Sequence, residues 1–274
     1  MRCELIHLKD IYPFLGEDGK DPTLEIYLPH NYESRQEQKR PAILLCPGGG
    51  YRIVSPREAE PIALHLFPEG FNVFILTYST QPHCFPTQIR EAAAAMEVIH
   101  ANADAWNTDK DRIGIMGFSA GAHLSAHYSN RYDCPEVREK FPESKPVKAS
   151  ILCYPVISGK NGTRHAGSFN KLSGHETATK EDLKAYSCEK MVTKKTPPAF
   201  LWHTAADPVV PVNNSLLYAQ ALAAKGIPFE LHVYPQGKHG LSTADLWTNT
   251  EIPPEVAPAA EWLPNLKRWL KQYI

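Results

Sequence analysis

The stretch Arg112-Ile-Gly-Ile-Met-Gly-Phe-Ser-Ala-Gly121 decides the fold of this chain, and a helix-compatible segment, Ala122-His-Leu-Ser-Ala-His127, follows it directly. The apolar residues after Arg112 are typical of a strand that is buried on both faces. The last five residues form a G-x-S-x-G pattern, in which the serine occupies a sharp turn and the glycines avoid clashes with neighbouring backbone. The pattern predicts a strand, a tight turn that presents Ser119, and a helix.

Short apolar runs and helical patterns alternate along the rest of the chain. Most of the apolar runs are rich in Ile, Val, Leu and Phe and are bounded by Gly or Pro, as expected of buried strands. The alternation predicts an α/β fold in one domain over residues 1–274, with a mostly parallel central sheet and helices on both faces. The predicted strands are Thr23–Leu28, Ala42–Cys46, Asn72–Tyr78, Arg112–Gly117, Ala149–Tyr154, Ala199–His203 and Phe229–Tyr234, and the predicted helices are Pro56–Phe67, Pro86–Ala103, Ala120–Ser129, Asn213–Lys225 and Pro258–Tyr273.

One long segment interrupts this alternation. Ser158–Pro198 is polar, contains four glycines, and separates the fifth and sixth predicted strands, which a short loop could join. A long insertion in a compact domain is more often functional than structureless. We therefore expect a cap-like insert at residues 158–198, with a plain surface excursion as the alternative.

The composition excludes several classes of protein. The chain has 29 basic and 30 acidic residues without a run of five or six like charges, which argues against nucleic-acid and membrane-surface partners. It has no apolar stretch long enough for a membrane span, and Met1–Leu15 mixes charged residues among apolar ones, unlike a signal peptide. Six cysteines without a C-x-x-C pair favour free thiols in the cytoplasm. We expect no metal or organic cofactor, and the oligomeric state stays open.

The serine of the turn requires a base and an acid to become a nucleophile. The base removes the hydroxyl proton, and the acid holds the base in one tautomer. In strand–turn–helix sites of this kind, the chain order is nucleophile, acid, base, each after a strand. Asp207 follows the predicted strand Ala199–His203, and Pro208 keeps its loop extended. His239 lies in a glycine-containing loop after the last predicted strand. We therefore predict Ser119 as nucleophile, Asp207 as acid and His239 as base.

Other histidines and aspartates fit this arrangement less well. His123 and His127 are four residues apart on the predicted helix, but without an H-E-x-x-H pattern they indicate helix packing rather than a metal pair. His203 lies within a predicted strand and is interpreted as a core or hydrogen-bonded histidine. His165 lies in the insert and precedes the acid, although it could contact substrate. Asp245 follows the base and is a distant competitor for the role of the acid.

Attack on an ester also requires donors for the oxyanion, and each donor is typically worth about 2.7–4 kcal/mol. One predicted donor is the N–H of Ala120, directly after the nucleophile. Three consecutive glycines follow the predicted strand Ala42–Cys46, where they allow close approach of the backbone to a ligand. From this triplet we choose Gly49 and Gly50 as the other donors. Tyr51 is expected to bind substrate in the acyl or alcohol pocket, with packing on the loop surface as the alternative.

Four segments together resemble a known family. They are similar to segments of the carbohydrate-esterase-like branch of the bacterial α/β-hydrolases, which contains acetylxylan esterases, feruloyl esterases and lipase/esterase-like proteins. The resemblance implies the α/β-hydrolase fold and a serine carboxylesterase that removes short acyl groups, acetyl first among them, from sugars through an acyl-enzyme on Ser119. The segments are Cys46-Pro-Gly-Gly-Gly-Tyr51, Gly117-Phe-Ser-Ala-Gly-Ala-His-Leu124, Trp202-His-Thr-Ala-Ala-Asp-Pro-Val-Val-Pro211 and His239-Gly-Leu241.

The chain departs from the family pattern at three positions. Pro47 stands where lipase-like relatives carry His before the glycines, and Ala122 stands where many relatives have a further Gly. Ala206 stands where many relatives have Asp. None of these differences removes a member of the predicted triad.

Two other functions remain open at this point. A serine peptidase similar to the prolyl oligopeptidases would share the turn and the Asp-x-x-Val-Pro loop. Those enzymes usually carry a further large domain, which a chain of 274 residues is not expected to hold. A non-catalytic binding protein of this fold would not need nucleophile, acid, base and glycine loop together. Hydrolysis of small acyl esters or acetylated sugars is therefore the predicted function.

Overall fold

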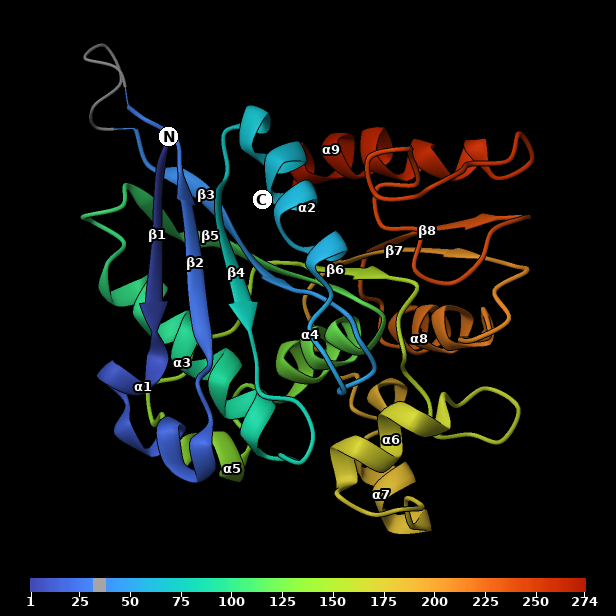
Figure 1. The fold of residues 1–274 in the computed structure, drawn as a ribbon, viewed down its shortest axis with the longest axis horizontal. Coiled ribbons are helices and arrows are strands. Elements are labelled where there is room, and N and C mark those ends of the chain that lie inside the picture. The colour runs from blue at the N-terminus through green and yellow to red at the C-terminus, as the bar shows by residue number, and fades with distance from the viewer. Residues whose placement is uncertain (32–37) are drawn as a thin grey trace.

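The structure, a computed structural model, describes residues 1–31 and 38–274. Within these residues, the strands form one eight-stranded sheet in the order β1-β2-β4-β3-β5-β6-β7-β8 (Figure 1). From β4 to β8 in this order every neighbouring pair is parallel, as predicted, whereas β2 is antiparallel to both β1 and β4. The strands are β1 (Arg2–His7), β2 (Thr23–Leu28), β3 (Arg40–Cys46), β4 (Asn72–Thr77), β5 (Thr108–Phe118), β6 (Ser150–Cys153), β7 (Ala199–Thr204) and β8 (Phe229–Tyr234).

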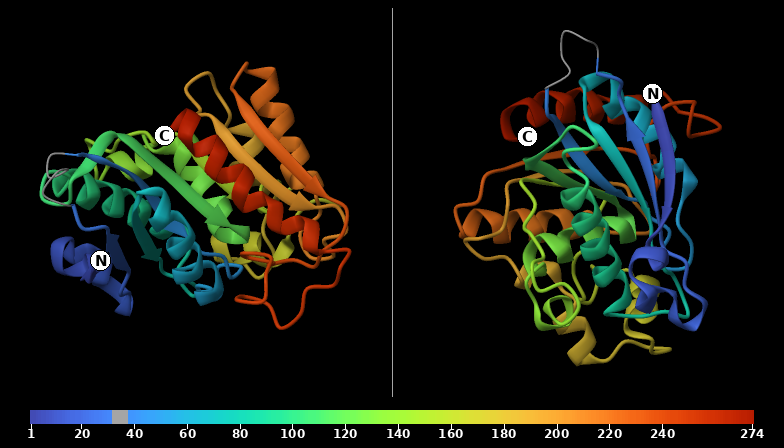
Figure 2. Two further views of the ribbon diagram at one scale, coloured as in Figure 1. Left: turned by 90° about the horizontal axis from the view of Figure 1, so that it is seen from above. Right: turned by 90° about the vertical axis from the view of Figure 1, so that its left-hand side faces the viewer.

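Helices surround the sheet (Figure 2). The α-helices are α1 (Leu8–Ile11), α2 (Glu60–Leu66), α3 (Thr87–Ala101), α4 (Ser119–Arg131), α5 (Pro135–Arg138), α6 (Ala166–Ser173), α7 (Lys180–Ala185), α8 (Asn213–Ala224) and α9 (Trp262–Tyr273). The short 3-10 turns are η1 (Pro13–Gly19), η3 (Pro56–Glu58), η4 (Phe67–Glu69), η5 (Cys188–Lys190) and η6 (Ala257–Glu261).

Alternation along the central strands builds a core on each face of the sheet. Successive side chains of a strand point to opposite faces, so neighbouring residues of β3 pack against different helices. Leu44 joins a buried cluster with residues of α3, whereas Ile43 and Leu45 join a cluster with residues of α2 and α9. A third cluster joins α4 to α8. Each fully buried Leu or Ile side chain contributes about 1.5–3 kcal/mol, which explains why the apolar runs marked these strands.

The N-terminal edge of the sheet differs from the sequence analysis, which did not predict β1. Its first four residues are exposed, and it pairs only with β2. Because an edge strand of this kind buries little apolar surface, its sequence lacks the apolar pattern that marks the central strands. In the described part of the chain, no helix is both long and apolar enough to cross a membrane. All six cysteines are free thiols.

The predicted insert lies between β6 and β7 and contains α6, α7 and η5. Figure 1 shows α6 and α7 together at one end of the molecule, below α4 and α8. The chain returns close to where it leaves β6, since the N–H of Cys188 donates to the carbonyl oxygen of Ile157 at 3.0 Å. The insert therefore covers one end of the sheet without adding a strand to it.

Candidate active site

The turn that carries Ser119 is strained and closely packed. Ser119 is the first residue of α4 and has a φ of 51°, a left-handed conformation that is uncommon outside glycine. A Cβ atom on Gly117 would lie 2.3 Å from the carbonyl oxygen of Gly121, and one on Gly121 would lie 2.0 Å from that of Cys46. Both contacts are impossible for a side chain, so the two glycines of the pattern are required by the close approach of β3, β5 and α4.

The structure brings the three predicted triad residues together. Ser119 Oγ lies 2.8 Å from His239 Nε2, and His239 Nδ1 lies 2.6 Å from Asp207 Oδ2. The other carboxylate oxygen, Asp207 Oδ1, accepts the N–H groups of Val209 and Val210, each at 2.9 Å. The Asp207 side chain is fully buried, while that of His239 is partly exposed. Each residue follows a parallel strand, which places all three at the carboxyl edge of the sheet.

The surroundings of Asp207 keep its carboxyl group ionised. Burial alone would raise its pKa, but the neighbouring imidazoles of His203 and His239 hold the pKa well below its usual value. His203 is fully buried, and its Nε2 lies 3.4 Å from Asp207 Oδ2. Both His203 nitrogens also have hydrogen-bond partners, Ser215 Oγ at 2.8 Å and the carbonyl oxygen of Val210 at 2.9 Å. The interpretation of His203 as a hydrogen-bonded core histidine is confirmed.

The glycine loop lies directly beside Ser119. A Cβ atom on Gly48 would lie 3.1 Å from the Cβ of Ser119. The N–H of Gly48 donates to the carboxylate of Glu58 at 2.8 Å, so this amide already has an acceptor. Gly49 and Gly50 have φ values of 130° and 65°, and a Cβ on Gly49 would lie 2.0 Å from a backbone carbonyl oxygen. The loop can therefore follow this path only with glycine at its centre.

The start of α4 offers a further donor. Ala120 is the second residue of this helix, and N–H groups in the first turn have no acceptor within the helix. The partial positive charge of a helix N-terminus also favours an anion at this point. The predicted oxyanion donors, Gly49, Gly50 and Ala120, thus come from two backbone segments that meet at Ser119.

Tyr51 lies differently from the expectation that it binds substrate. Its φ of 58° turns the side chain inward, where the ring is only 1% exposed. The hydroxyl lies 2.9 Å from Nδ1 of His123 on α4, and the ring packs edge-on against Tyr78. Tyr51 therefore connects the glycine loop to α4 through a buried side chain. The sequence could not show this, because the inward turn depends on the backbone conformation.

The insert reaches the glycine loop through α6. A Cβ atom on Gly50 would lie 3.8 Å from Cε1 of His165 and 3.9 Å from Oγ of Ser168. His165 Nδ1 and Ser168 Oγ are themselves 2.8 Å apart. Burial, and next the imidazole of His239, lower the pKa of His165 below its usual value. The insert thus places a neutral imidazole above the glycine loop.

Sequence reasoning missed two residues of the site, Glu58 and Tyr154. The Glu58 side chain is buried and accepts a hydrogen bond from the hydroxyl of Tyr154 at 2.5 Å. No sequence signal distinguishes Glu58 from Glu60, which is exposed and lies two residues later in the same acidic segment. Tyr154 stands at the end of an apolar run, where an aromatic residue is expected in any core.

His123 and His127 pack within the protein, as the absence of an H-E-x-x-H pattern indicated. Both nitrogens of His123 have partners, and His127 stacks on Phe85 with parallel rings whose centroids are 5.4 Å apart. In residues 1–31 and 38–274, no group of three or more His, Cys, Asp or Glu side chains is arranged to hold a metal ion.

Burial of His127 makes stability depend on pH. Burial lowers its pKa to about 3, so the folded protein keeps the ring neutral while the unfolded chain gains a proton below about pH 6.5. Protonation of the unfolded chain lowers the free energy of unfolding progressively as the pH falls from about 6.5 towards 3. At pH 5 the protein has lost about 2 kcal/mol of the unfolding free energy that it has at neutral pH. His127→Phe, which keeps an aromatic ring against Phe85, is expected to lose correspondingly less unfolding free energy between pH 7 and pH 5. Urea unfolding at both pH values measures this, and an unchanged pH dependence in the variant would contradict it.

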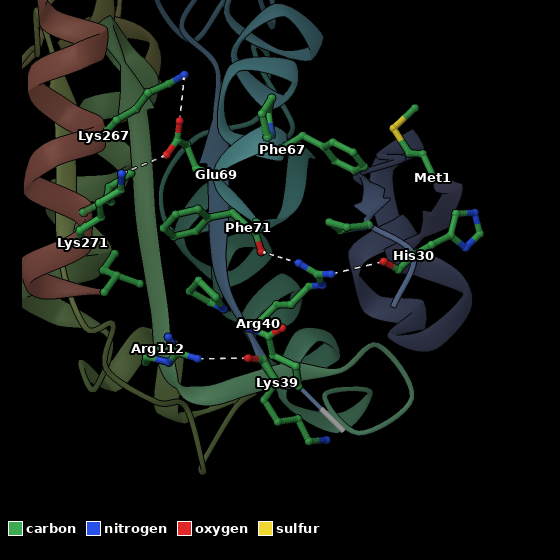
Figure 3. Close-up of a pocket in the computed structure, with 17 residues that line it drawn as sticks. Met1, His30, Lys39, Arg40, Phe67, Glu69, Phe71, Arg112, Lys267 and Lys271 are labelled. Atoms are coloured by element: carbon green, nitrogen blue, oxygen red, sulfur yellow. Dashed lines mark hydrogen bonds and ion pairs between the residues drawn. The ribbon is translucent and has the colours of Figure 1, made fainter. Parts of the chain in front are cut away.

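A cavity of about 910 Å³ lies away from the triad, near the start of β3 and the end of α9 (Figure 3). Its cations already have partners. Lys267 and Lys271 pair with Glu69, while Arg40 and Arg112 donate to backbone carbonyl oxygens. The cavity lies by the amino ends of parallel strands, and its charges are paired. We therefore assign the candidate active site to the carboxyl edge of the sheet, where the triad lies.

Comparisons with known proteins show the family of this chain. Residues 24–222 match the model of the BD-FAE family. The chain is 37% identical over 252 residues to endo-1,4-beta-xylanase B of Butyrivibrio fibrisolvens, covering 88% of this chain and 38% of that protein. It is 33% identical over 231 residues to an acetylxylan esterase of Xylanibacter ruminicola, covering 82% of this chain and 45% of that protein. The chain therefore spans less than half the length of these two relatives.

A solved structure extends the similarity over the whole chain. The acetyl ester-xyloside bifunctional hydrolase from Caldicellulosiruptor lactoaceticus is 34% identical and superposes with a TM-score of 0.85. The match covers 99% of this chain and 96% of that one. The predicted α/β-hydrolase fold is confirmed.

Proposed function

Because the chain belongs to the BD-FAE family, we propose that it is a serine carboxylesterase that hydrolyses short-chain acyl esters. The observation that carries the proposal is the pair of hydrogen bonds that links Ser119 to His239 at 2.8 Å and His239 to Asp207 at 2.6 Å. A hydroxyl, an imidazole and a buried carboxylate in this order are the parts needed to generate a serine nucleophile.

The reaction begins with proton transfer from Ser119 to His239. As Nε2 of His239 takes the hydroxyl proton, Oγ attacks the acyl carbon and the carbonyl electrons move onto oxygen. The N–H groups of Ala120, Gly49 and Gly50 stabilise this oxyanion. The imidazolium, held by the carboxylate of Asp207, then donates its proton to the leaving alcohol, and an acyl-enzyme on Ser119 remains.

Water completes the cycle by the same route. His239 takes a proton from water as the water oxygen attacks the acyl-enzyme, and the second oxyanion occupies the same backbone donors. Collapse of this intermediate releases the carboxylic acid and returns the proton from His239 to Ser119. No group outside the protein, the ester and water takes part in this sequence.

We place acetylated carbohydrates first among the substrates. The relatives named above include an acetylxylan esterase and an acetyl ester-xyloside hydrolase, which supports this class of substrate. The position of His165 above Gly50 limits the space over the glycine loop, which supports a small acyl group. The free thiols of all six cysteines support the cytoplasmic location expected from the sequence.

Two measurements test this function. A fluorophosphonate, which reacts preferentially with activated serines, is expected to label the peptide that contains Ser119, as read by mass spectrometry. For p-nitrophenyl acetate, butyrate and octanoate, kcat/KM is expected to fall with chain length, and acetate release from acetylated xylo-oligosaccharides extends the result to sugars. Labelling of another peptide would refute the assignment of Ser119 as the nucleophile. A higher kcat/KM for the octanoate ester would refute the proposed preference for short acyl groups.

A further inference from the structure

The short turn η3 places a buried carboxylate beneath the candidate active site. Glu58 is only 5% exposed, and each of its carboxylate oxygens accepts one hydrogen bond. Oε2 accepts the N–H of Gly48, the first residue of the glycine loop, at 2.8 Å. Oε1 accepts the hydroxyl of Tyr154, the residue after β6, at 2.5 Å. One side chain thus joins two segments that lie about a hundred residues apart in the sequence.

Tyr154 extends this connection to the catalytic base. Its hydroxyl oxygen accepts the N–H of Ser242, three residues after His239, at 3.0 Å. Its ring packs edge-on against the imidazole of His239, with centroids 5.1 Å apart and planes at 73°. Tyr154 has a φ of 36°, so the backbone departs from ordinary extended geometry to aim the ring at this place. The phenol therefore contacts both the base and the loop that carries it.

We propose that Glu58 is a positioning residue for ester hydrolysis. It fixes the glycine loop and His239 relative to each other, because it binds Gly48 and Tyr154 at the same time. The inference rests on the function proposed above, because it assigns Glu58 a role in the reaction of Ser119. Glu58 does not touch the reacting atoms. It acts through the backbone at Gly48 and through the phenol that supports His239.

The chemistry of the contact explains why the residue is a glutamate. Two donors, an amide and a phenol, converge from different directions, and a carboxylate offers an acceptor oxygen to each. Burial raises the pKa of Glu58 above its usual value, although the bonds from Tyr154 and Gly48 oppose this. Burying a carboxyl group is unfavourable compared with an apolar side chain of the same volume. A residue that only filled this space would not need two acceptor oxygens.

The neighbouring residue, Arg57, fastens the same turn to the loop after the base. Its guanidinium donates to the carbonyl oxygens of Gly240 at 2.8 Å and Thr248 at 2.7 Å. In the opposite direction, the hydroxyl of Ser242 donates to the carbonyl oxygen of Arg57 at 2.5 Å. Through η3, the glycine loop and the loop of His239 are therefore hydrogen-bonded to one short element, and we expect a shift of Glu58 to change the distance between them.

The test is Glu58→Gln, which keeps the size of the side chain but replaces one acceptor oxygen by a donor. We expect kcat for p-nitrophenyl acetate to fall about 10- to 100-fold, as for a small misplacement of catalytic groups, while KM stays nearly unchanged. A short alkylboronic acid, which forms a tetrahedral adduct on an active serine, is expected to bind more weakly by the same factor as kcat/KM falls. If Glu58 had only a structural role, the variant would show a lower unfolding temperature, and its loss of boronic acid affinity would not equal its loss of kcat/KM.

Two further variants keep the test decisive. Tyr154→Phe retains the ring against His239 but removes the hydroxyl, and it is expected to lower kcat in the same way. It therefore tests the proposal even if Glu58→Gln does not fold. Glu97→Gln is the matched control, because Glu97 accepts the hydroxyl of Tyr12 at 2.7 Å away from the triad, and its kcat is expected to stay at the wild-type value. Wild-type turnover in both Glu58→Gln and Tyr154→Phe would overturn the positioning role. Loss of the proposed function itself would instead show as wild-type hydrolysis that does not depend on Ser119.

Discussion

Replacing Ser119 by alanine is expected to lower kcat for p-nitrophenyl acetate by about a million-fold, the loss typical of removing the nucleophile of a serine hydrolase. The Oγ atom is the group that lies 2.8 Å from Nε2 of His239, so alanine leaves the base without a hydroxyl to deprotonate. Hydrolysis by water beside the remaining oxyanion donors accounts for the residual rate. The substitution removes one oxygen from a largely buried position and leaves the backbone turn unchanged, so the fold is expected to persist.

The measurement is release of p-nitrophenol by wild type and variant, with circular dichroism and thermal unfolding recorded on the same samples. Ser129→Ala is the matched control, because Ser129 is also buried on α4 but donates to the carbonyl oxygen of Ser125 at 2.7 Å. This control is expected to retain wild-type kcat. A folded Ser119→Ala variant with substantial activity would remove Ser119 from the mechanism.

Asp207→Asn is expected to lower kcat by about 10⁴-fold, although it changes neither size nor shape. The N–H groups of Val209 and Val210 both donate to Oδ1, so the amide oxygen of asparagine must take that position. Its NH₂ group then faces Nδ1 of His239 in place of the carboxylate oxygen that lies 2.6 Å away. Nδ1 must become an acceptor, the ring proton moves to Nε2, and Nε2 can no longer accept the proton of Ser119.

This prediction also separates the two candidate acids. Asp245 binds the hydroxyl of Thr243 and the N–H of Trp247 at the surface, and Asp245→Asn is expected to leave kcat unchanged. The comparison requires kcat and KM for both variants at the same pH. If Asp207→Asn stayed active while Asp245→Asn lost activity, the role of the acid would pass to Asp245.

The central part of the fold was predictable because its strands are buried on both faces. β2 and β8 have the predicted bounds, and β3, β4, β5, β6 and β7 differ from prediction only at their ends. For β3 to β7 the apolar composition is a consequence of burial between two helical layers, whereas the edge strand β8 has no buried residue and was marked by its apolar and aromatic residues alone. β1 was missed for the opposite reason, since an exposed edge strand is held by backbone pairing with β2 and leaves no apolar signature. The short helices α6 and α7 of the insert were not predicted, because helices of 8 and 6 residues are too short for a helical repeat to stand out in the sequence.

The site was predictable where chain order and turn geometry constrain it. Ser119 was marked by its glycines, and Asp207 and His239 by their positions after parallel strands. Tyr51 and Glu58 depend instead on contacts made across the fold, the first with α4 and the second with the residue after β6. A tyrosine beside a glycine triplet and a glutamate in an acidic segment are both usual surface residues, so only the folded arrangement shows that they are buried.

The position of the insert has a consequence for how this scaffold can change over time. β6 and β7 are hydrogen-bonded neighbours, with Cys153 paired to Trp202, so the insert leaves the sheet and rejoins it at adjacent points. Its outer part can therefore vary without altering the strand register, whereas Cys188 and Val192 belong to the buried cluster with α4 and α8. We expect exchange of the outer part of the insert to change the surface beside the glycine loop, where α6 and the residue before it place Ser168 and His165, while the strands that carry Ser119, Asp207 and His239 stay as they are.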